Sequence, residues 1–306
     1  MRTEHLRAFE TVARRGTFTR AAQELYLTQP SLSRQVAALE AELGAELLER
    51  GRRGAVPTAA GAALLPIARR MLADADSLRL ELDELAGLRR GRVRLGAPPT
   101  LCVSLVAEVL ADSVVRFPGV ELQISEAGSL AVMQKLHEGD LDLAVVVTRG
   151  DTFESEGAEL IPLLRERLVV VSAATREGSL PESVTLARLA EMPQVCFDRS
   201  YALRAATDAA FAAAGLTPRI AVEGAEMDAV LRFVERGIGV AVVPAMVVAG
   251  RPGLTWSALI EPELDRTVNL ARRRGVRLSP AAAAMQELVF ETVALMELPG
   301  VLRLGD

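Results

Sequence analysis

The segment that most constrains the fold of this chain is residues 18–40, with the sequence FTRAAQELYLTQPSLSRQVAALE. Its apolar residues recur at helical spacing on both sides of the short connection YLT, which indicates two helices joined by a tight turn. Thr28 fits the N-cap of the second helix, and Pro30 falls in its first turn, where a missing N–H costs nothing. Ala21 and Ala22 supply the small side chains that two closely crossing helices need. The segment therefore predicts a helix-turn-helix.

Another helix is predicted before this pair. Apolar residues between positions 6 and 13 recur at helical spacing, and Gly16 fits the C-terminal stop of that helix. Either Thr17 or Thr19 can then cap the helix that follows.

The second helix of the pair is predicted to have two different faces. The inward residues are expected to be Leu32, Val36, Leu39 and Leu43, with the helix ending at Gly44. The outward face carries Gln29, Pro30, Ser31, Ser33, Arg34 and Ala37. Such a face can enter the major groove of DNA, where Arg pairs with guanine, Gln with adenine, and Ser with base edges or phosphate. The alternative is a solvated helix face with a good N-cap and no binding role.

A hairpin is expected after Gly44, in the sequence AELLERGRRGAVPTAAG. Two short extended segments surround a tip rich in Arg and Gly, an arrangement that resembles a wing beside the recognition helix. Arg52 and Arg53 at the tip can reach the DNA backbone or a minor groove.

The first sixty residues resemble a known DNA-binding domain. The stretch HLRAFETVARRGTFTRAAQELYLTQPSLSRQVAALEAELGAELLER, followed by RGAVPTAAG, is similar to the winged helix-turn-helix of the LysR-type transcriptional regulators. The resemblance implies that polar residues of the recognition helix face bases or nearby phosphates and that a wing arginine touches DNA. The predicted DNA-contacting residues are Thr28, Gln29, Pro30, Ser31, Ser33, Arg34, Arg52 and Arg53. We assign residues 1–58 to this domain.

A long linker helix is predicted over residues 59–89, because before residue 87 Gly and Pro occur only in its early turns. The stretch GLRRGRV at 87–93 resembles a hinge and marks the end of the helix. Its apolar residues follow a heptad seam, which consists of Leu64, Ala68, Met71, Ala75, Leu78, Leu82 and Leu85. One interpretation is an amphipathic helix packed on its own chain. The strict spacing and a polar face rich in Arg, Asp and Glu favour the other, a dimerisation helix. The family resemblance implies that such dimers often join into tetramers.

Strands and helices alternate in the remaining residues, 90–306. RVRLGA, VELQISEA and LDLAVVV are strand-like with helical segments between them, and a second such set extends from ERLVVVSA to GVAVVP. This alternation predicts parallel sheet covered by helices on both faces, and two sets predict two lobes. The phrases FPGVELQISEAG, LHEGDLDLAVV and VERGIGVAVVP resemble the family's effector-binding domain, which is like a periplasmic binding protein. The resemblance implies a first lobe of residues 90–162 and 268–306 and a second of 163–267.

Three turns at strand ends are candidates for a ligand site between these lobes: GAPPTL, VVVTRG and FDRSYAL. Ligands of such folds bind at the carboxyl ends of strands and at helix N-termini, where free amides suit a carboxylate. The predicted effector-binding residues are Pro99, Thr100, Leu101, Thr148, Arg149, Ser200 and Tyr201. The alternative is that Thr100 and Ser200 only cap their helices. Pro98 and Pro99 stand where many relatives have small polar residues, which leaves the effector class open.

Cysteine and histidine content limits the other function classes. Cys102 and Cys196 are far apart, and the only histidines are His5 and His137, so no Cys/His metal site is expected. No GxSxG or HExxH motif is present, and GIGVAV follows a helix, the reverse of what dinucleotide binding needs. We therefore expect no enzyme activity, no metal and no cofactor. A redox sensor is an alternative, because a helix N-terminus such as that before Cys102 lowers a thiol pKa.

Charge and the lack of export signals complete the expected picture. The formal net charge is −5, but residues 1–60 carry 9 Arg against 7 acidic residues and are the segment suited to phosphate. No signal-peptide pattern and no long apolar run occurs, so we expect a cytoplasmic protein without a membrane partner, and not an exported transport binding protein.

The expected fold is an N-terminal all-α winged helix-turn-helix, a long linker helix and a C-terminal α/β two-lobed periplasmic-binding-protein-like domain. The expected function is sequence-specific transcriptional regulation in response to a small-molecule effector. The expected partners are double-stranded DNA with a partly palindromic operator, an effector such as a carboxylate, and further copies of the chain in a homodimer or homotetramer.

Overall fold

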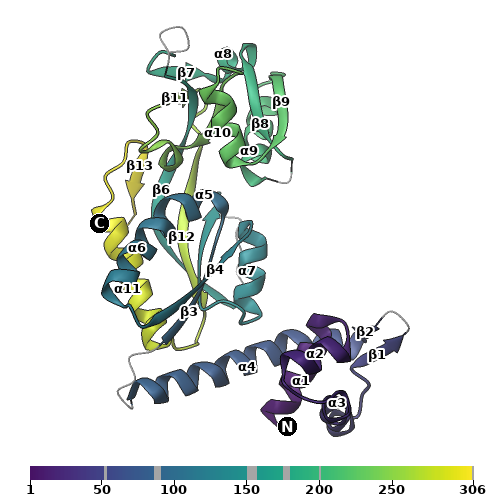
Figure 1. The fold of residues 1–306 in the computed structure, drawn as a ribbon. Helices are drawn as coiled ribbons and strands as arrows, with labels where there is room; N and C mark the ends of the chain where they lie inside the picture. The colour runs from purple at the N-terminus through teal and green to yellow at the C-terminus, as the bar shows by residue number, and fades with distance from the viewer. Residues whose placement is uncertain (52–53, 86–90, 150–156, 175–179, 200, 305–306) are drawn as a thin grey trace.

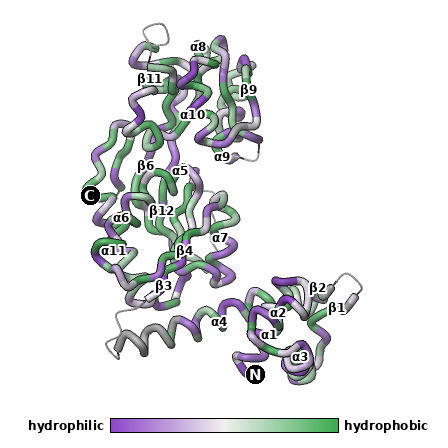
Figure 2. Tube along the Cα trace, in the orientation of Figure 1, coloured by the Kyte–Doolittle hydropathy of each residue, from purple (hydrophilic) through white to green (hydrophobic). Residues whose placement is uncertain are grey.

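A computed structural model describes residues 1–51, 54–85, 91–149, 157–174, 180–199 and 201–304 of the 306-residue chain. It shows a small N-terminal domain, one long helix, and a larger sheet-rich domain of two lobes (Figure 1). Hydrophobic segments concentrate along the central strands of the two lobes (Figure 2). Among the described residues, no helix is long and apolar enough to cross a lipid bilayer.

The N-terminal domain consists of three helices and a two-stranded hairpin. These elements are α1 Thr3–Arg15, α2 Phe18–Glu24, α3 Gln29–Leu43, β1 Leu48–Gly51 and β2 Gly54–Pro57. The predicted helix-turn-helix with a wing is therefore confirmed. Gly16 ends α1 in the left-handed conformation, with φ 69°. Thr17, and not Thr19, caps α2, because its Oγ1 accepts the N–H of Arg20 at 3.3 Å.

Three apolar residues of α3 pack with α1 and α2 in one core, namely Leu32, Val36 and Leu39. The prediction that Leu43 also faces inward was wrong, since 44% of its surface is exposed. Leu43 lies in the last turn of α3, beyond the buried part of the helix.

The hairpin is fixed to the rest of the domain by backbone contacts. β1 and β2 pair antiparallel, from Leu48 opposite Pro57 to Gly51 opposite Gly54. The N–H of Ala55 donates to the carbonyl of Gly16 at 2.7 Å. A Cβ on Gly54 would lie 2.2 Å from that same carbonyl oxygen, so only glycine permits this approach. The wing therefore has a defined position relative to the turn between α1 and α2.

The long helix α4, Ala59–Leu85, contains 27 residues and is about 40 Å long. Thr58 caps it, because its Oγ1 accepts the N–H of Gly61 at 3.0 Å. The first half of α4 packs on the core of the N-terminal domain through Leu64, Ala68 and Leu72. Packing on its own chain, one of the two predicted roles, therefore holds for this half.

Lobe I is formed by the N-terminal part of the larger domain together with the last segments of the chain. Its elements are β3 Gly91–Ala97, α5 Pro99–Leu101, a π-helical turn η1 Cys102–Val106, α6 Ala107–Arg116, β4 Val120–Glu126, α7 Ser129–His137, β5 Leu143–Thr148, β12 Asp265–Arg273, α11 Pro280–Leu295 and β13 Val301–Arg303. β3 pairs in parallel with β4 and β5. α6 and α11 cover one face of this sheet and α7 covers the other (Figure 1).

Lobe II contains the remaining elements. They are β6 Ala158–Ala173, β7 Ser183–Thr185, α8 Leu186–Glu191, β8 Pro193–Phe197, α9 Ala202–Ala213, β9 Arg219–Ala225, α10 Met227–Glu235, β10 Ala241–Pro244, a 3-10 turn η2 Ala245–Val248 and β11 Leu254–Ile260. β8 and β9 form a parallel pair, whereas β10 and β11 pair antiparallel with β6.

Two strands pass between the lobes. β6 is 16 residues long, and it pairs with β12 over residues 158–167 and with β10 and β11 over 168–173. The predicted lobe boundaries fall inside β6 and β12. The expected parallel pairing holds for β3 with β4 and β5, for β8 with β9 and for β7 with β11, but not for β12, which runs antiparallel to β5 and β6.

α4 also contacts lobe I. Arg69 of α4 forms an ion pair with Glu138, directly after α7, and its Nε lies 3.6 Å from a carboxylate oxygen of Glu10 in α1. Further along the helix, Asp74 Oδ1 lies 3.1 Å from Nη1 of Arg273 at the end of β12. Ionic contacts therefore join the N-terminal domain, the long helix and lobe I.

Candidate functional site

The recognition surface predicted on α3 is a solvent-facing strip. Leu32, Val36 and Leu39 are fully buried, so the opposite side of the helix faces outward. Four of the predicted DNA-contacting residues of α3 and its cap are exposed, namely Thr28, Gln29, Pro30 and Arg34. Ser31 and Ser33 are partly buried. Thr28 does cap the helix, since its Oγ1 accepts the N–H of Ser31 at 3.4 Å, but its exposure leaves it accessible to a ligand as well.

Arg34 contributes a positive charge to this strip. Its guanidinium makes no hydrogen bond or ion pair with the described residues. By contrast, Arg14 and Arg15 both donate hydrogen bonds to the carboxylate of Glu24. These bonds lower the pKa of that carboxyl, and the bond from Arg14 has the larger effect. Arg34 is therefore the residue of the strip best placed to bind guanine or phosphate.

The two wing arginines of the prediction, Arg52 and Arg53, lie outside the described residues. The strands that flank them, β1 and β2, are described, and their contact with Gly16 fixes the direction in which the hairpin extends.

The predicted seam of α4 divides into parts with different surroundings. Leu64 and Ala68 pack on the chain's own N-terminal domain. Met71 and Leu78 are 41% and 57% exposed, and Ala75 is partly buried. The side chains of Leu82 and Leu85 lie outside the described part of the chain. Ile67 lies one turn before Met71 and is 44% exposed, so it forms an exposed apolar stripe with Met71 and Leu78. The heptad assignment missed it.

Between the lobes, a buried polar cluster connects four elements. Thr100 Oγ1 accepts a hydrogen bond from Arg266 Nη1 at 2.9 Å. Arg266 Nε donates to Glu166 Oε2 at 2.8 Å, and Glu166 Oε1 accepts the N–H of Met246 at 2.7 Å. All three side chains are buried, and Glu166 is completely so. A buried ion pair is tolerated only when further hydrogen bonds satisfy both partners, as they do for this carboxylate.

The cluster also contains a buried N–H donor without an aligned acceptor. Nη2 of Arg266 is within ion-pair distance of Glu166, 2.7 Å, yet it is buried and has no aligned hydrogen-bond acceptor among the described residues. Arg149 is partly buried close enough to Arg266 for the two charges to interact. Burial lowers the pKa of Arg149, the charge of Asp265 raises it, and the charge of Arg266 lowers it. The carboxylates of Glu166 and Asp265 accompany the two guanidinium groups, and the group without an aligned acceptor is the Nη2 donor of Arg266.

Thr148, the last residue of β5, is also bonded to β12. Its Oγ1 accepts a hydrogen bond from Asn269 Nδ2 at 3.0 Å. The structure therefore gathers three of the predicted effector residues, Thr100, Thr148 and Arg149, near the part of β12 where the strand passes between the lobes.

The other predicted effector residues are not joined to this group. Leu101 is fully buried in the core of lobe I, so its side chain is not open to a ligand. Pro99 is partly exposed at the start of α5. Tyr201 lies in lobe II, where its ring stacks on Phe197 and its hydroxyl donates to the Glu226 carboxylate. Ser200 lies outside the described residues.

Sequence reasoning missed three polar residues of the cluster: Glu166, Arg266 and Asn269. A signal for them exists, because each interrupts a strand that is otherwise largely apolar, in RERLVVV and DRTVNLA. A buried charge within such a strand needs a partner, and the partner is found on the neighbouring strand.

The thiol pKa values of the two cysteines do not fit a redox sensor. Burial and the charge of Glu126 raise the pKa of Cys102 to about 11, and burial raises that of Cys196. The expectation of a lowered thiol pKa at Cys102 was wrong, because desolvation outweighs the helix N-terminus. The reactive thiolate is therefore scarce near neutral pH.

Two family models match most of the chain. Residues 3–62 match the bacterial regulatory helix-turn-helix protein, lysR family, and residues 86–294 match the LysR substrate binding domain. The nitrogen assimilation regulatory protein nac of Klebsiella aerogenes is 31% identical over 299 residues, which cover 96% of each protein.

Two solved structures share the arrangement. A full-length OxyR variant from Pseudomonas aeruginosa superimposes with a TM-score of 0.74 at 22% identity, covering 100% of this chain and 98% of that one. Full-length CbnR in complex with its target DNA has a TM-score of 0.66 at 25% identity, covering 95% of this chain and 100% of the other.

Proposed function

The chain belongs to the LysR family of transcriptional regulators, and from this membership we propose that it binds a specific, partly palindromic DNA site and changes that binding when a small anionic effector occupies the interlobe cluster. It has a DNA-binding and a substrate-binding domain, and family members are regulators and not enzymes.

The exposed strip of α3 is the observation that carries the DNA-binding part of the proposal. Gln29 and Arg34 are exposed on a helix whose other face is the domain core, and Arg34 has no ion-pair partner within the described part of the chain. Side chains of this kind distinguish base pairs in the major groove. The related CbnR, crystallised with its target DNA, supports the same use of this domain.

One recognition helix contacts too few base pairs to be selective, so we propose that two copies act together. The exposed apolar stripe of Ile67, Met71 and Leu78 on α4 provides a surface through which a second α4 can pair. Two recognition helices then read half-sites separated by whole turns of DNA.

The effector part of the proposal rests on the cluster of Thr100, Arg149 and Arg266. A carboxylate placed there would accept a hydrogen bond from Arg266 Nη2, the buried donor without an aligned acceptor. Since Arg266 lies on a strand that crosses between lobes, the ligand can bias the interlobe angle and, through α4, the paired recognition helices.

The experiment that tests this function is selection of genomic DNA fragments by the purified protein at two salt concentrations, followed by footprinting. Recovery of one or a few promoters, with protected half-sites a whole number of helical turns apart, is the expected result. Random fragments that dissociate uniformly as salt rises would indicate phosphate binding alone and would refute specific regulation.

The effector part has its own test. The thermal midpoint of unfolding is measured with a panel of small carboxylates and with the corresponding uncharged amides. Carboxylates that stabilise the wild type and lose this effect in Arg149→Gln support the site. Equal stabilisation by the amides would contradict an anionic effector.

A further inference from the structure

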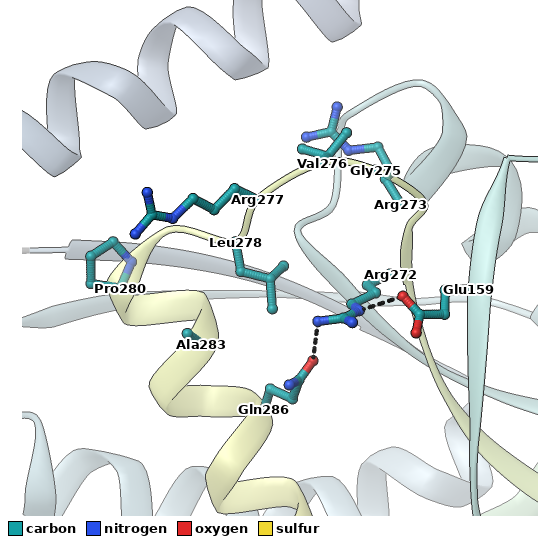
Figure 3. A pocket seen from close by; sticks show the side chains of 10 residues that line it. All are labelled: Glu159, Arg272, Arg273, Gly275, Val276, Arg277, Leu278, Pro280, Ala283 and Gln286. Carbon is teal, nitrogen blue, oxygen red and sulfur yellow. Dashed lines mark hydrogen bonds and ion pairs between the residues drawn. The ribbon is translucent and has the colours of Figure 1, made fainter.

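A cavity lies at the opposite end of β12 from the interlobe cluster. It has a volume of about 950 Å³ and is lined by the end of β12, the loop to α11, the first turns of α11 and Glu159 of β6 (Figure 3). Arg272 and Arg266 are six positions apart on one strand, a separation of roughly 20 Å. The cavity is therefore distinct from the proposed effector site.

Arginine side chains dominate the polar lining. Arg272, Arg273 and Arg277 line the cavity, against one acidic residue, Glu159. Arg272 is held in place, because its Nε donates to Glu159 Oε2 at 2.9 Å and its Nη1 to Gln286 Oε1 at 3.4 Å. Arg277 is exposed and makes no ion pair or hydrogen bond with the described residues. At least one guanidinium is thus free to bind a ligand.

The rest of the wall is apolar. It consists of Val276, Leu278, Pro280 and Ala283, with Leu278 directed toward the Arg272 side chain in Figure 3. An inorganic ion would leave this surface wet, whereas a molecule with an apolar body would cover it. The cavity also lies at the N-terminus of α11, a 16-residue helix whose positive end favours negative charge.

We propose that this cavity is a second ligand site, for an organic carboxylate with an aromatic or branched apolar body. The carboxylate binds Arg277, and the apolar body lies against Val276, Leu278 and Ala283. This site is additional to the interlobe site and does not depend on what binds there.

Binding at this cavity is linked to α4 through Arg273. Its Nη1 lies 3.1 Å from Asp74 of α4, so Asp74 already neutralises one of the cavity's arginines. A ligand carboxylate that approaches Arg273 competes with Asp74. Removal of the Asp74 charge should therefore strengthen ligand binding, and ligand binding should weaken the contact between α4 and lobe I.

The test uses 4-azidobenzoate as a photoreactive probe on the full-length protein, with the attached peptides identified by mass spectrometry. The expected result is saturable labelling within residues 272–286. Labelling should fall about tenfold in Arg277→Gln, because a charge-assisted hydrogen bond is lost. The matched control is Arg236→Gln, an exposed arginine of lobe II, which should label as the wild type does.

A second variant, Asp74→Asn, tests the link between the cavity and α4. Asp74→Asn should raise labelling of residues 272–286 at a fixed low probe concentration, since it removes the competing carboxylate. Labelling of residues 272–286 that is absent, that is unsaturable, or that is the same in Arg277→Gln and wild type would overturn the proposal. Unchanged or reduced labelling in Asp74→Asn would overturn the link to α4.

Discussion

Glu166 of β6 and Arg266 of β12 are direct cross-strand partners, and their charged groups lie 2.7 Å apart with the carboxylate completely buried. The pair stands where the two crossing strands pass between the lobes. Thr100 of lobe I accepts a hydrogen bond from Arg266, and the N–H of Met246 in lobe II donates to Glu166, so the pair is bonded to both lobes.

Glu166→Gln should lower the free energy of unfolding by about 3–5 kcal/mol, because it leaves the Arg266 charge buried without its counter-ion. Urea denaturation followed by circular dichroism measures the change. The matched control is Glu263→Gln, which removes an exposed carboxylate paired with Arg167 and should cost less than about 1 kcal/mol. Similar losses in the two variants would show that burial of the pair is unimportant.

Arg34→Ala should weaken binding to the selected operator by about 1–3 kcal/mol and leave binding to random DNA nearly unchanged, since a base contact carries sequence information. Arg52→Ala should lower affinity for both DNAs alike, as expected of a phosphate contact. Fluorescence anisotropy at fixed salt provides both affinities. Equal losses on the two DNAs for both variants would refute this division of roles.

Leu78→Asp should shift the chain from dimer toward monomer, because it places a charge in the exposed apolar stripe of α4. Sedimentation equilibrium measures the association constant. Leu130→Asp, on the exposed surface of α7, is the matched control and should associate as the wild type does. An unchanged association constant in Leu78→Asp would exclude this part of α4 from the dimer contact.

Cys102 should react slowly with iodoacetamide at pH 7.5, and its rate should rise steeply only as the pH approaches its pKa of about 11. The sign follows from the raised pKa: at any pH below it the protonated, unreactive thiol predominates. Mass spectrometry of the labelled peptide over a pH series gives the profile. Labelling at pH 7.5 faster than that of a free cysteine would restore the redox alternative.

Local signals allowed the N-terminal domain to be predicted in detail. The glycine stop at Gly16, the cap at Thr28 and the apolar spacing of α3 act within one or two turns of chain, and the structure places them as expected. Leu43 was misplaced because its burial depends on how far α3 extends past its neighbours. No feature of the helix itself reports that extent.

Contacts distant in sequence limited the prediction of the larger domain. The order of strands and helices followed from their periodicity, but the direction of β12 depends on pairing with residues about a hundred positions away. The cluster of Glu166 and Arg266 exists only through that pairing. The sequence indicated Thr100 and Arg149 from their turns, but their arginine neighbour could be assigned only from the folded strands.

The uninterrupted course of β6 has a mechanical consequence. Ladder hydrogen bonds keep paired strands about 4.8 Å apart, whereas the twist between neighbours varies by roughly 25° among known sheets. A ribbon of β6 and β12 is therefore stiff toward stretching and compliant toward torsion, and its ladder has a register shift between Val268 and Asn269. Lobe motion should then be a rotation about the ribbon axis, so spectroscopic labels placed along that axis would keep their separation while labels across the lobes would report a changing angle.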